Sequence, residues 1–274
     1  MKIGLTIAGS DSGGGAGIQA DLKTFQQFGV FGTSVIVALT AQNTRGVRAV
    51  ETVPEAMILG QLTALAEDLP PAALKTGMLA EAGIVRLVAK AIRENGWAPL
   101  VVDPVMVATS GHRLLTAEAE DVVRESLLPL ATLATPNLDE AAILTGRVVH
   151  DIPTMIRAGE TLLRFGAGAV LVKGGHLASD EITDVLVTGD GLRQFTRPRL
   201  TTTSTHGTGC TLSAAVTAGL ALGRDLDTAV SDALDFVYRA IAEAPGLGSG
   251  HGPLNHTVPA RLSSRGSAAT EGSS

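Results

Sequence analysis

The alternation of short apolar runs with helix-length stretches constrains the fold of this chain more than any other feature of its sequence. The runs have the length and the small aliphatic composition of strands buried on both faces, and they cover residues 2–9, 32–40, 72–79, 99–106, 131–137 and 167–175. The helix-length stretches cover residues 15–28, 54–68, 81–95, 116–128, 137–145 and 153–166. Repeated right-handed βαβ units join such elements into a parallel sheet with helices on both faces. The sequence therefore predicts an α/β fold.

The C-terminal part of the chain adds further features to this pattern. Residues 182–200 hold two short runs around the turn sequence TGDG, which is typical of an antiparallel hairpin at a sheet edge. A helix is predicted over residues 225–243. Residues 259–274 carry too few apolar side chains to offset the entropy lost on ordering, so we expect a disordered tail there. No Pro- or Ser-rich linker interrupts the rest, which predicts a single domain over residues 1–258.

The charge balance and the cysteine count exclude several classes of partner. The net charge is −6, from 21 Lys and Arg against 27 Asp and Glu, and this leaves no basic stripe for a nucleic-acid backbone. A single cysteine cannot form an internal disulfide. The first apolar run is too short for a signal sequence or a membrane span. We therefore expect a soluble, cytoplasmic protein that binds neither nucleic acid nor membrane.

Polar residues stand at or just beyond the end of nearly every predicted strand. They are Asp11, Gln42, Asn43, Lys75, Met78, Asp103, Asn137, Glu140, Lys173 and His176. In open parallel sheets, ligands bind beyond the carboxyl ends of the strands. The sequence therefore predicts a small-molecule site at this edge of the sheet.

The first glycine loop, GSDSGGGAGIQAD at residues 9–21, formally matches the G-x-G-x-x-G/A fingerprint of dinucleotide-binding folds. That fingerprint also requires an acidic residue at the end of the second strand, where this chain has Gln42. The alternative is that the glycines serve a tight turn and the close packing of a helix. The sequence has neither a G-x-x-x-x-G-K-[ST] phosphate loop nor a G-x-S-x-G nucleophile turn.

The second glycine loop, HGTGC at residues 206–210, precedes an apolar run of helical length. The backbone N–H groups of Thr208, Gly209, Cys210 and Thr211 would lie at the positive end of the helix dipole. Glycine lets a phosphate approach that backbone closely. The loop therefore predicts an anion-binding turn.

Cys210, the only cysteine, admits several interpretations. His206 lies four residues before it, but no second pair of ligands accompanies them, which disfavours zinc. The absence of a resolving cysteine disfavours a redox role. A lone cysteine is often a buried small residue, whereas at a helix N-terminus its pKa is lowered and the thiol can serve as a base or nucleophile. A phosphate held in the same turn would raise that pKa again.

Taken together, the motifs of this chain closely resemble one known family. The motifs are GSDSGGGAGIQADLKT (9–24), TAQNTRGV (40–47), KTGML (75–79), VVDPVMVATSG (101–111), TPNLDEAAIL (135–144), VLVKGGH (170–176) and THGTGCTLSAA (205–215). In this order and spacing they resemble the hydroxymethylpyrimidine and hydroxymethylpyrimidine phosphate kinases of thiamin biosynthesis, within the ribokinase-like superfamily. The superfamily signature G-x-G-D ends in Asp, whereas this branch has G-T-G-C, as here. The resemblance spans residues 1–258.

The resemblance implies a fold, a reaction and an assembly. The fold would be a central, mostly parallel β-sheet with helices on both faces and small flap strands over the site. The reaction would be ATP-dependent phosphorylation of 4-amino-5-hydroxymethyl-2-methylpyrimidine and then of its monophosphate, with Mg²⁺. The family also implies a homodimer.

The family roles fall on specific positions of this chain. Residues that would line the pyrimidine pocket are Ala16, Asp21, Gln42, Met78 and Val105. Residues that would organise Mg²⁺ and the triphosphate are Asp103, Asn137 and Glu140, with Asp103 and Glu140 as the metal ligands and Lys173 and Thr208 as phosphate contacts. The anion hole for the transferred group would be Gly207, Thr208 and Gly209, and Cys210 would face the substrate hydroxyl as general base or only orient it.

Several of these residues also have structural interpretations. Asp103 before Pro104 could form a turn, and Asn137 with Glu140 three residues later could form a helix cap. Gln42 and Met78 could be core residues. His206 is expected to shape its loop by hydrogen bonding, and no family role is assigned to Lys75.

Two other functions stay open at this level. A pyridoxal kinase would use the same fold, because pyridoxal also presents a hydroxymethyl group on a ring. A protein that binds the pyrimidine without catalysis is the second alternative, and the combination of Asp103, Glu140, Lys173 and the anion-binding turn argues against it.

Overall fold

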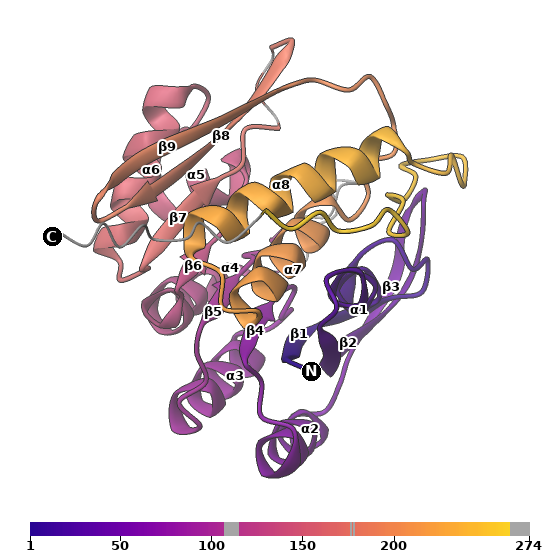
Figure 1. Cartoon of the computed structure of the whole chain (residues 1–274). Coiled ribbons are helices and arrows are strands. Elements are labelled where there is room, and N and C mark those ends of the chain that lie inside the picture. Colours follow the sequence, from indigo (N-terminus) through magenta and orange to yellow (C-terminus); the bar gives the residue numbers. More distant parts are fainter. Residues whose placement is uncertain (107–114, 176, 178, 264–274) are drawn as a thin grey trace, which may run out of the picture.

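The computed structural model describes residues 1–106, 115–175, 177 and 179–263, and in these residues a nine-stranded sheet lies between two layers of helices (Figure 1). The sheet order is β3-β2-β1-β4-β5-β6-β7-β8-β9. The strands are β1 (Ile3–Asp11), β2 (Phe31–Asn43), β3 (Gly46–Thr52), β4 (Ala73–Thr76), β5 (Leu100–Val102), β6 (Leu133–Ala134), β7 (Ala169–Val172), β8 (Glu181–Thr188) and β9 (Gly191–Pro198).

In the order of the sheet, strands β2, β1, β4, β5, β6 and β7 run parallel. The antiparallel strands β3 and β8 flank them on the two sides. The chain passes from β1 to its neighbour β2 on one side and later returns to pair β4 on the other side of β1. The strand order therefore reverses between β1 and β4. In open α/β sheets such a reversal leaves a crevice at the carboxyl ends of the strands.

Helices cover both faces of the sheet. One face carries α1 (Gly17–Gln27), α7 (Thr208–Ala221) and α8 (Leu226–Ala242), and α7 packs against both α1 and α8 (Figure 1). The other face carries α2 (Glu55–Asp68), α3 (Ala82–Glu94), α4 (Ala117–Val122), α5 (Leu138–Thr145) and α6 (Ile152–Arg164). Side-chain caps fix several helix starts, including a capping box at Asp151 for α6 and the carboxylate of Asp225 for α8.

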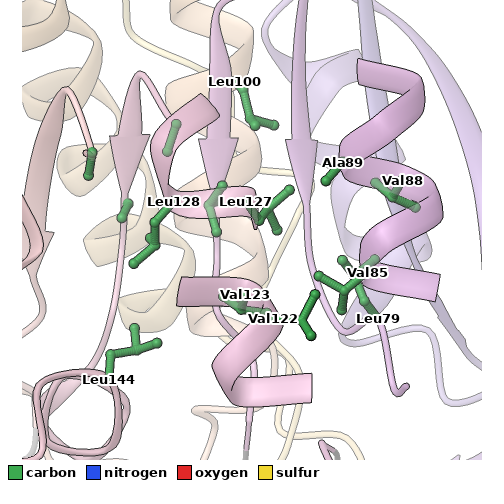
Figure 2. Packing of buried hydrophobic residues seen from close by; sticks show 14 of the residues in the cluster. Leu79, Val85, Val88, Ala89, Leu100, Val122, Val123, Leu127, Leu128 and Leu144 are labelled. Carbon is green, nitrogen blue, oxygen red and sulfur yellow. The ribbon is translucent and has the colours of Figure 1, made fainter. Parts of the chain in front are cut away.

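The core follows the two-residue period of the strands. In β5, Leu100 and Val102 pack toward α3 and its neighbours, whereas Val101 packs toward α7 and α8. Figure 2 shows part of the first layer, where Val85 of α3 and Val122 of α4 lie on the same side of the sheet. Small aliphatic side chains of this kind suit close packing of helices on a parallel sheet.

The predicted α/β fold is confirmed, and the antiparallel hairpin expected over residues 182–200 appears as β8 and β9. Two details differ from expectation. β3 was not predicted, because its side chains are mostly exposed and leave no apolar alternation to detect. The single helix expected over residues 116–128 is instead α4, a π-helical turn η1 (Val123–Leu127) and a 3₁₀ turn η2 (Leu128–Leu130) that contains Pro129.

The start of the expected tail is placed against the protein. The Pro259 carbonyl accepts a hydrogen bond from Arg239 of α8 at 2.9 Å, and Ser263 contacts the carboxylate of Asp232. These contacts shorten the predicted tail at its beginning, and residues 264–274 lie outside the described residues. Within the described ranges, no helix has the length and apolar character needed to span a membrane.

Candidate active site

The turn before α7 requires a glycine, because any side chain there would force the backbone to move. Gly207 caps α7 with φ +84°, a left-handed conformation that favours glycine. A Cβ at this position would lie 1.8 Å from the carbonyl oxygen of Gly15. The turn and the first glycine loop are thus in direct backbone contact, and they form two sides of one site.

The first turn of α7 faces a buried group of charges. Lys173, just beyond β7, places its Nζ 3.1 Å from Asp103 Oδ1 and 3.8 Å from Glu140 Oε2. A Cβ added to Gly209 would lie 3.1 Å from the same Nζ and 3.6 Å from Asp103 Oδ2. The glycine therefore leaves the helix N-terminus open toward the ammonium group, where a phosphate would find both backbone N–H groups and a positive charge.

Asp103 is almost fully buried and is surrounded by polar partners. Thr135 Oγ1 lies 3.4 Å from its Oδ1, and Ser213 Oγ of α7 lies 3.3 Å from its Oδ2. Burial alone would lower the pKa of Lys173, but the charges of Asp103 and Glu140 outweigh it and raise that pKa. Lys173 is therefore a permanent cation at neutral pH.

Asn137 and Glu140 form the helix cap that their spacing predicts. The Asn137 side chain accepts from the Glu140 N–H at 2.9 Å, and the Asn137 N–H donates to Glu140 Oε2 at 2.8 Å. The cap and the contact with Lys173 use the same carboxylate. Burial raises the pKa of Glu140 to about 7, with Lys173 opposing the shift and Asp103 adding to it.

Cys210 is half-buried at the third position of α7. Burial raises the pKa of its thiol to about 12, and the positive charge of Lys75 and a hydrogen bond from the Gly17 N–H offset only part of that rise. Burial, one of the interpretations that the sequence left open for this cysteine, therefore outweighs the lowering of the pKa that a helix N-terminus alone would cause. The thiol is protonated at neutral pH in this structure.

A fully buried ion pair lies near this thiol, between β4 and α1. Lys75 Nζ is 3.0 Å from Asp21 Oδ1, and Thr6 donates to Asp21 Oδ2 at 2.6 Å. Neither charged side chain has exposed surface. Asp21 was predicted to line the pyrimidine pocket, and in this structure its carboxylate contacts Lys75 and Thr6. The signal for the pair in the sequence is a lysine inside the buried strand ALKT.

A second polar cluster joins the carboxyl ends of β1 and β2 to the turn before α7. His206 Nε2 lies 2.9 Å from Asp11 Oδ2 and 3.1 Å from Nε2 of Gln42. The expectation that His206 shapes its loop by hydrogen bonding is confirmed. Asp11 also accepts hydrogen bonds from the N–H groups of Gly13 and Ala16, both at 2.8 Å.

Comparison with known proteins decides the family. Residues 11–255 match the family profile described as Phosphomethylpyrimidine kinase. The hydroxymethylpyrimidine/phosphomethylpyrimidine kinase of Rhizobium meliloti (strain 1021) is 52% identical over 257 residues, which are 93% of this chain and 96% of that protein. The chain belongs to the phosphomethylpyrimidine kinase family.

Solved structures agree with this assignment and confirm the ribokinase-like fold. An ADP complex of Bacillus subtilis pyridoxal kinase superimposes with a TM-score of 0.88 at 39% identity, covering 93% of this chain and 97% of that chain. A phosphomethylpyrimidine kinase from Clostridium difficile 630 superimposes with a TM-score of 0.79 at 43% identity, covering 88% of this chain and all of that one. The phosphomethylpyrimidine kinase family and its pyridoxal kinase neighbours thus share this architecture.

The other residues predicted to line the pyrimidine pocket lie at the same edge of the sheet. Ala16 is the N-cap of α1, and the half-buried Val105 follows β5. Met78 is 8% exposed, and its Cε would lie 2.5 Å from a Cβ added to Gly9 of β1, so it packs closely over that strand. His176 and residues 107–111 of the motif VVDPVMVATSG lie outside the described residues.

The sequence analysis missed the hydroxyl groups around the charged side chains of this site and one further carboxylate. Thr6, Thr135 and Ser213 have no distinctive spacing in the sequence, and only their contacts identify them. Asp184 of β8 accepts from the Gly174 N–H at 2.8 Å, next to Lys173 in the chain. The available signal was an acidic residue directly before the apolar residues VLV of β8.

The co-substrate of a kinase family is ATP. The carboxylates of this site fit a Mg²⁺ ion that keeps its water molecules better than one that the protein coordinates directly. Asp103 and Glu140 supply the oxygen ligands that Mg²⁺ prefers, but Lys173 already contacts both carboxylates. In the part of the chain that the structure describes, no three His, Cys, Asp or Glu side chains come together as a metal site. Mg²⁺ usually keeps several waters and binds with substrate phosphates. Asp103 and Glu140 therefore suit contacts to its water molecules.

Proposed function

We propose that this chain transfers the γ-phosphoryl group of ATP to the hydroxymethyl oxygen of 4-amino-5-hydroxymethyl-2-methylpyrimidine and then phosphorylates the monophosphate to the diphosphate, for thiamin biosynthesis. One observation carries the proposal: in a member of this family, Gly209 opens the N-terminus of α7 onto the Lys173–Asp103 ion pair. The N–H groups of Thr208 and Thr211 donate to the Thr205 and Gly207 carbonyls, so the arrangement offers to a phosphoryl group a cation and the N–H groups of Gly209 and Cys210.

In the proposed reaction, a bond forms between the hydroxymethyl oxygen and the γ-phosphorus while the bond from that phosphorus to the β,γ-bridging oxygen breaks, and ADP leaves. The transition state of such transfers is loose, so catalysis consists mainly of positioning and charge neutralisation. Gly207, Thr208 and Gly209 supply the turn that holds the transferred group. Lys173 neutralises charge that develops on the phosphate oxygens.

Cys210 is proposed to orient the substrate hydroxyl. It is not proposed to act as a thiolate that removes the hydroxyl proton. A thiol whose pKa is about 12 is neutral at physiological pH. A loose transition state leaves little work for a base before the new bond forms. The hydroxyl proton can then leave late in the reaction, to a phosphoryl oxygen or to water.

The nucleotide would be held by the side of the site that carries Asp103, Asn137, Glu140, Lys173 and Thr208. When bound, Mg²⁺ supplies charge neutralisation for the triphosphate, with Asp103 and Glu140 contacting its water shell. The pyrimidine would lie against Ala16, Gln42, Met78 and Val105. Asp21 would act from beneath this pocket, by fixing Lys75.

The test is ADP release by the full chain with Mg-ATP and each of three acceptors: the hydroxymethylpyrimidine, its monophosphate and pyridoxal. We expect turnover of the pyrimidine and a second equivalent of ADP from its monophosphate. Faster phosphorylation of pyridoxal than of the pyrimidine would overturn the choice of substrate. Release of only one equivalent would remove the second step from the proposal.

Pyridoxal kinase is the second candidate, favoured by one observation. The pyridoxal kinase of Bacillus subtilis superimposes on this chain with a TM-score of 0.88. Against it stands the higher identity, 52%, to a relative named for the pyrimidine reaction. The same assay with three acceptors separates the two functions.

We further propose that the protein is a homodimer of the cytoplasm. Large apolar side chains are exposed on β2, β3 and α2, at Phe31, Leu39, Val50, Met57 and Leu59. Exposed apolar side chains at this edge of the sheet suit contact with a second copy of the chain. Sedimentation equilibrium of the wild type and of Leu39→Glu tests this, since an interface through Leu39 predicts a dimer for the first and a monomer for the second.

A further inference from the structure

We propose that Asp11 and His206 are positioning residues that hold the side-chain amide of Gln42 in one orientation, with its oxygen toward His206, and thereby select a ring that carries an amino group beside a ring nitrogen. The proposal rests on the proposed function, because it concerns the specificity of the same site. It follows from which atoms in this cluster can donate a hydrogen and which can only accept one.

The chain of contacts begins at Asp11, the last residue of β1. Its Oδ1 accepts from the Gly13 N–H at 2.8 Å, and its Oδ2 accepts from Gly15 at 3.1 Å and Ala16 at 2.8 Å. Burial would raise the pKa of this carboxyl, but His206 and these N–H groups outweigh burial and lower it. Asp11 is therefore an ionised carboxylate, which can only accept.

The ionised carboxylate fixes the hydrogen on His206. His206 Nε2 lies 2.9 Å from Asp11 Oδ2, so that nitrogen must carry a hydrogen and donate it. The His206 ring is buried, and the backbone N–H of His206 donates to the Gly252 carbonyl at 3.1 Å, which fixes the backbone from which the ring projects. His206 Nε2 therefore has no lone pair to accept with, and the atom of the Gln42 amide that faces it must be an acceptor.

The threonine on the other side of the amide imposes the opposite requirement. Thr40 Oγ1 lies 2.9 Å from the Ser10 carbonyl oxygen, which can only accept, and 3.2 Å from the far end of the Gln42 amide. The single hydroxyl hydrogen of Thr40 is committed to Ser10. Its oxygen is then an acceptor for Gln42, and the group that suits it is the NH₂.

These two requirements agree on one orientation of the amide. The structure places Gln42 Nε2 3.1 Å from His206 Nε2, which brings two donors together, and Oε1 against the hydroxyl oxygen of Thr40. The two ends of an amide have nearly the same shape, so half a rotation about the last side-chain bond exchanges them and moves no other group. After that rotation the single hydrogen of His206 Nε2 is shared between Asp11 Oδ2 and Gln42 Oε1 in a three-centre hydrogen bond, and Nε2 of Gln42 donates to Thr40.

A fixed amide can read an aminopyrimidine at two points. One lone pair of Oε1 and one hydrogen of Nε2 remain unused, and an amino group beside a ring nitrogen offers the matching donor and acceptor. Gln and Asn read adenine by the same pairing, and a good two-point pair discriminates by about tenfold or more. An amide free to rotate would lose this advantage, because half of its orientations oppose donors to donors.

The experiment compares the hydroxymethylpyrimidine with 5-hydroxymethyl-2-methylpyrimidine, the same alcohol without the amino group, as substrates of the full chain with Mg-ATP. In the wild type we expect loss of the amino group to raise KM at least tenfold with little change in kcat. In Thr40→Val and His206→Leu we expect KM for the two alcohols to differ by less than threefold. In His206→Gln, whose amide N–H can donate to Asp11, we expect most of the wild-type difference to return.

Thr40→Val also separates positioning from folding, because it leaves the turn before α7 intact and should not change KM for ATP. Variants that lower kcat for both alcohols equally and keep the tenfold difference in KM would overturn the proposal. A wild type that turns over neither alcohol would overturn the proposed function and this inference with it. A wild type that turns over both alcohols with equal KM would leave the kinase function standing and overturn only the role of the fixed amide.

Discussion

Lys75 Nζ lies 3.0 Å from Asp21 Oδ1, and the two side chains, 54 residues apart in the sequence, have no exposed surface. Burial alone would lower the pKa of Lys75, but the negative charge of Asp21 outweighs it and raises that pKa. The pair ties β4 to α1 across the point where the strand order reverses. It also places a positive charge near Cys210.

Replacing Lys75 by Met should destabilise the fold by about 3–5 kcal/mol, because the change leaves the Asp21 carboxylate buried without its counter-charge. Urea unfolding monitored by circular dichroism measures this. The double variant Lys75→Met with Asp21→Leu should recover much of the loss, since a buried pair can often be exchanged for apolar residues of similar size.

The exposed pair Arg86–Glu118, with side chains 55% and 68% exposed, supplies the control. Arg86→Met should change the free energy of unfolding by less than about 1 kcal/mol, because solvent screens such pairs. Equal stability of Lys75→Met and the wild type would contradict the importance of the buried pair.

The Lys75–Asp21 pair also marks how far the sequence could predict this site. The order of strands and helices follows from local periodicity, and the Asn137–Glu140 cap follows from a spacing of three. Which buried lysine meets which carboxylate depends on the order of strands in the sheet, and no local pattern encodes that order. The sequence left the pKa of Cys210 open for the same reason, because local sequence does not show which distant segments bury the thiol.

Gly209→Ala should lower kcat/KM by about 100-fold or more while changing the free energy of unfolding by less than about 1 kcal/mol. The added methyl would lie 3.1 Å from Lys173 Nζ, at the opening through which a phosphoryl group approaches the helix. A displacement of about 1 Å at such a point is enough for a loss of this size. Steady-state kinetics and urea unfolding of one preparation provide both values.

Gly60→Ala is the matched control for this change, because Gly60 lies in α2 and a Cβ there meets no atom within 4 Å. It should stabilise the protein by about 0.5–1 kcal/mol and leave kcat/KM unchanged. If Gly209→Ala kept kcat/KM within threefold of the wild type, the opening at α7 would not be the phosphoryl site.

The thiol of Cys210 should react slowly with iodoacetamide at pH 7.5. Its pKa of about 12 leaves roughly 3,000-fold less thiolate than a free cysteine of pKa about 8.5 carries. Because the chain has one cysteine, mass spectrometry reports this site alone. The same chain unfolded in urea is the control and should react at the ordinary rate, and equally fast labelling of the folded chain would show a low pKa instead.

Cys210→Ala should lower kcat by about 10- to 100-fold and leave KM for ATP within twofold. The reason is that the thiol is proposed to orient the acceptor hydroxyl and does not contact the nucleotide. A larger loss, accompanied by a new inflection in the pH profile of kcat, would indicate a general base. A normal kcat would remove Cys210 from the reaction.

The stability of the protein should fall as the pH drops from about 6.5 to about 4, and His256 should account for about 2 kcal/mol of the loss between pH 8 and pH 5. Burial lowers the pKa of His256 to about 4, so between these two values the unfolded chain binds a proton that the folded chain does not. His256 Nε2 lies 2.9 Å from Thr211 Oγ1 of α7. His256→Gln offers that threonine a neutral partner that does not titrate. The difference in unfolding free energy between variant and wild type should therefore shift by about 2 kcal/mol in favour of the variant from pH 8 to pH 5. A difference that does not depend on pH would show that His256 titrates normally in the folded protein.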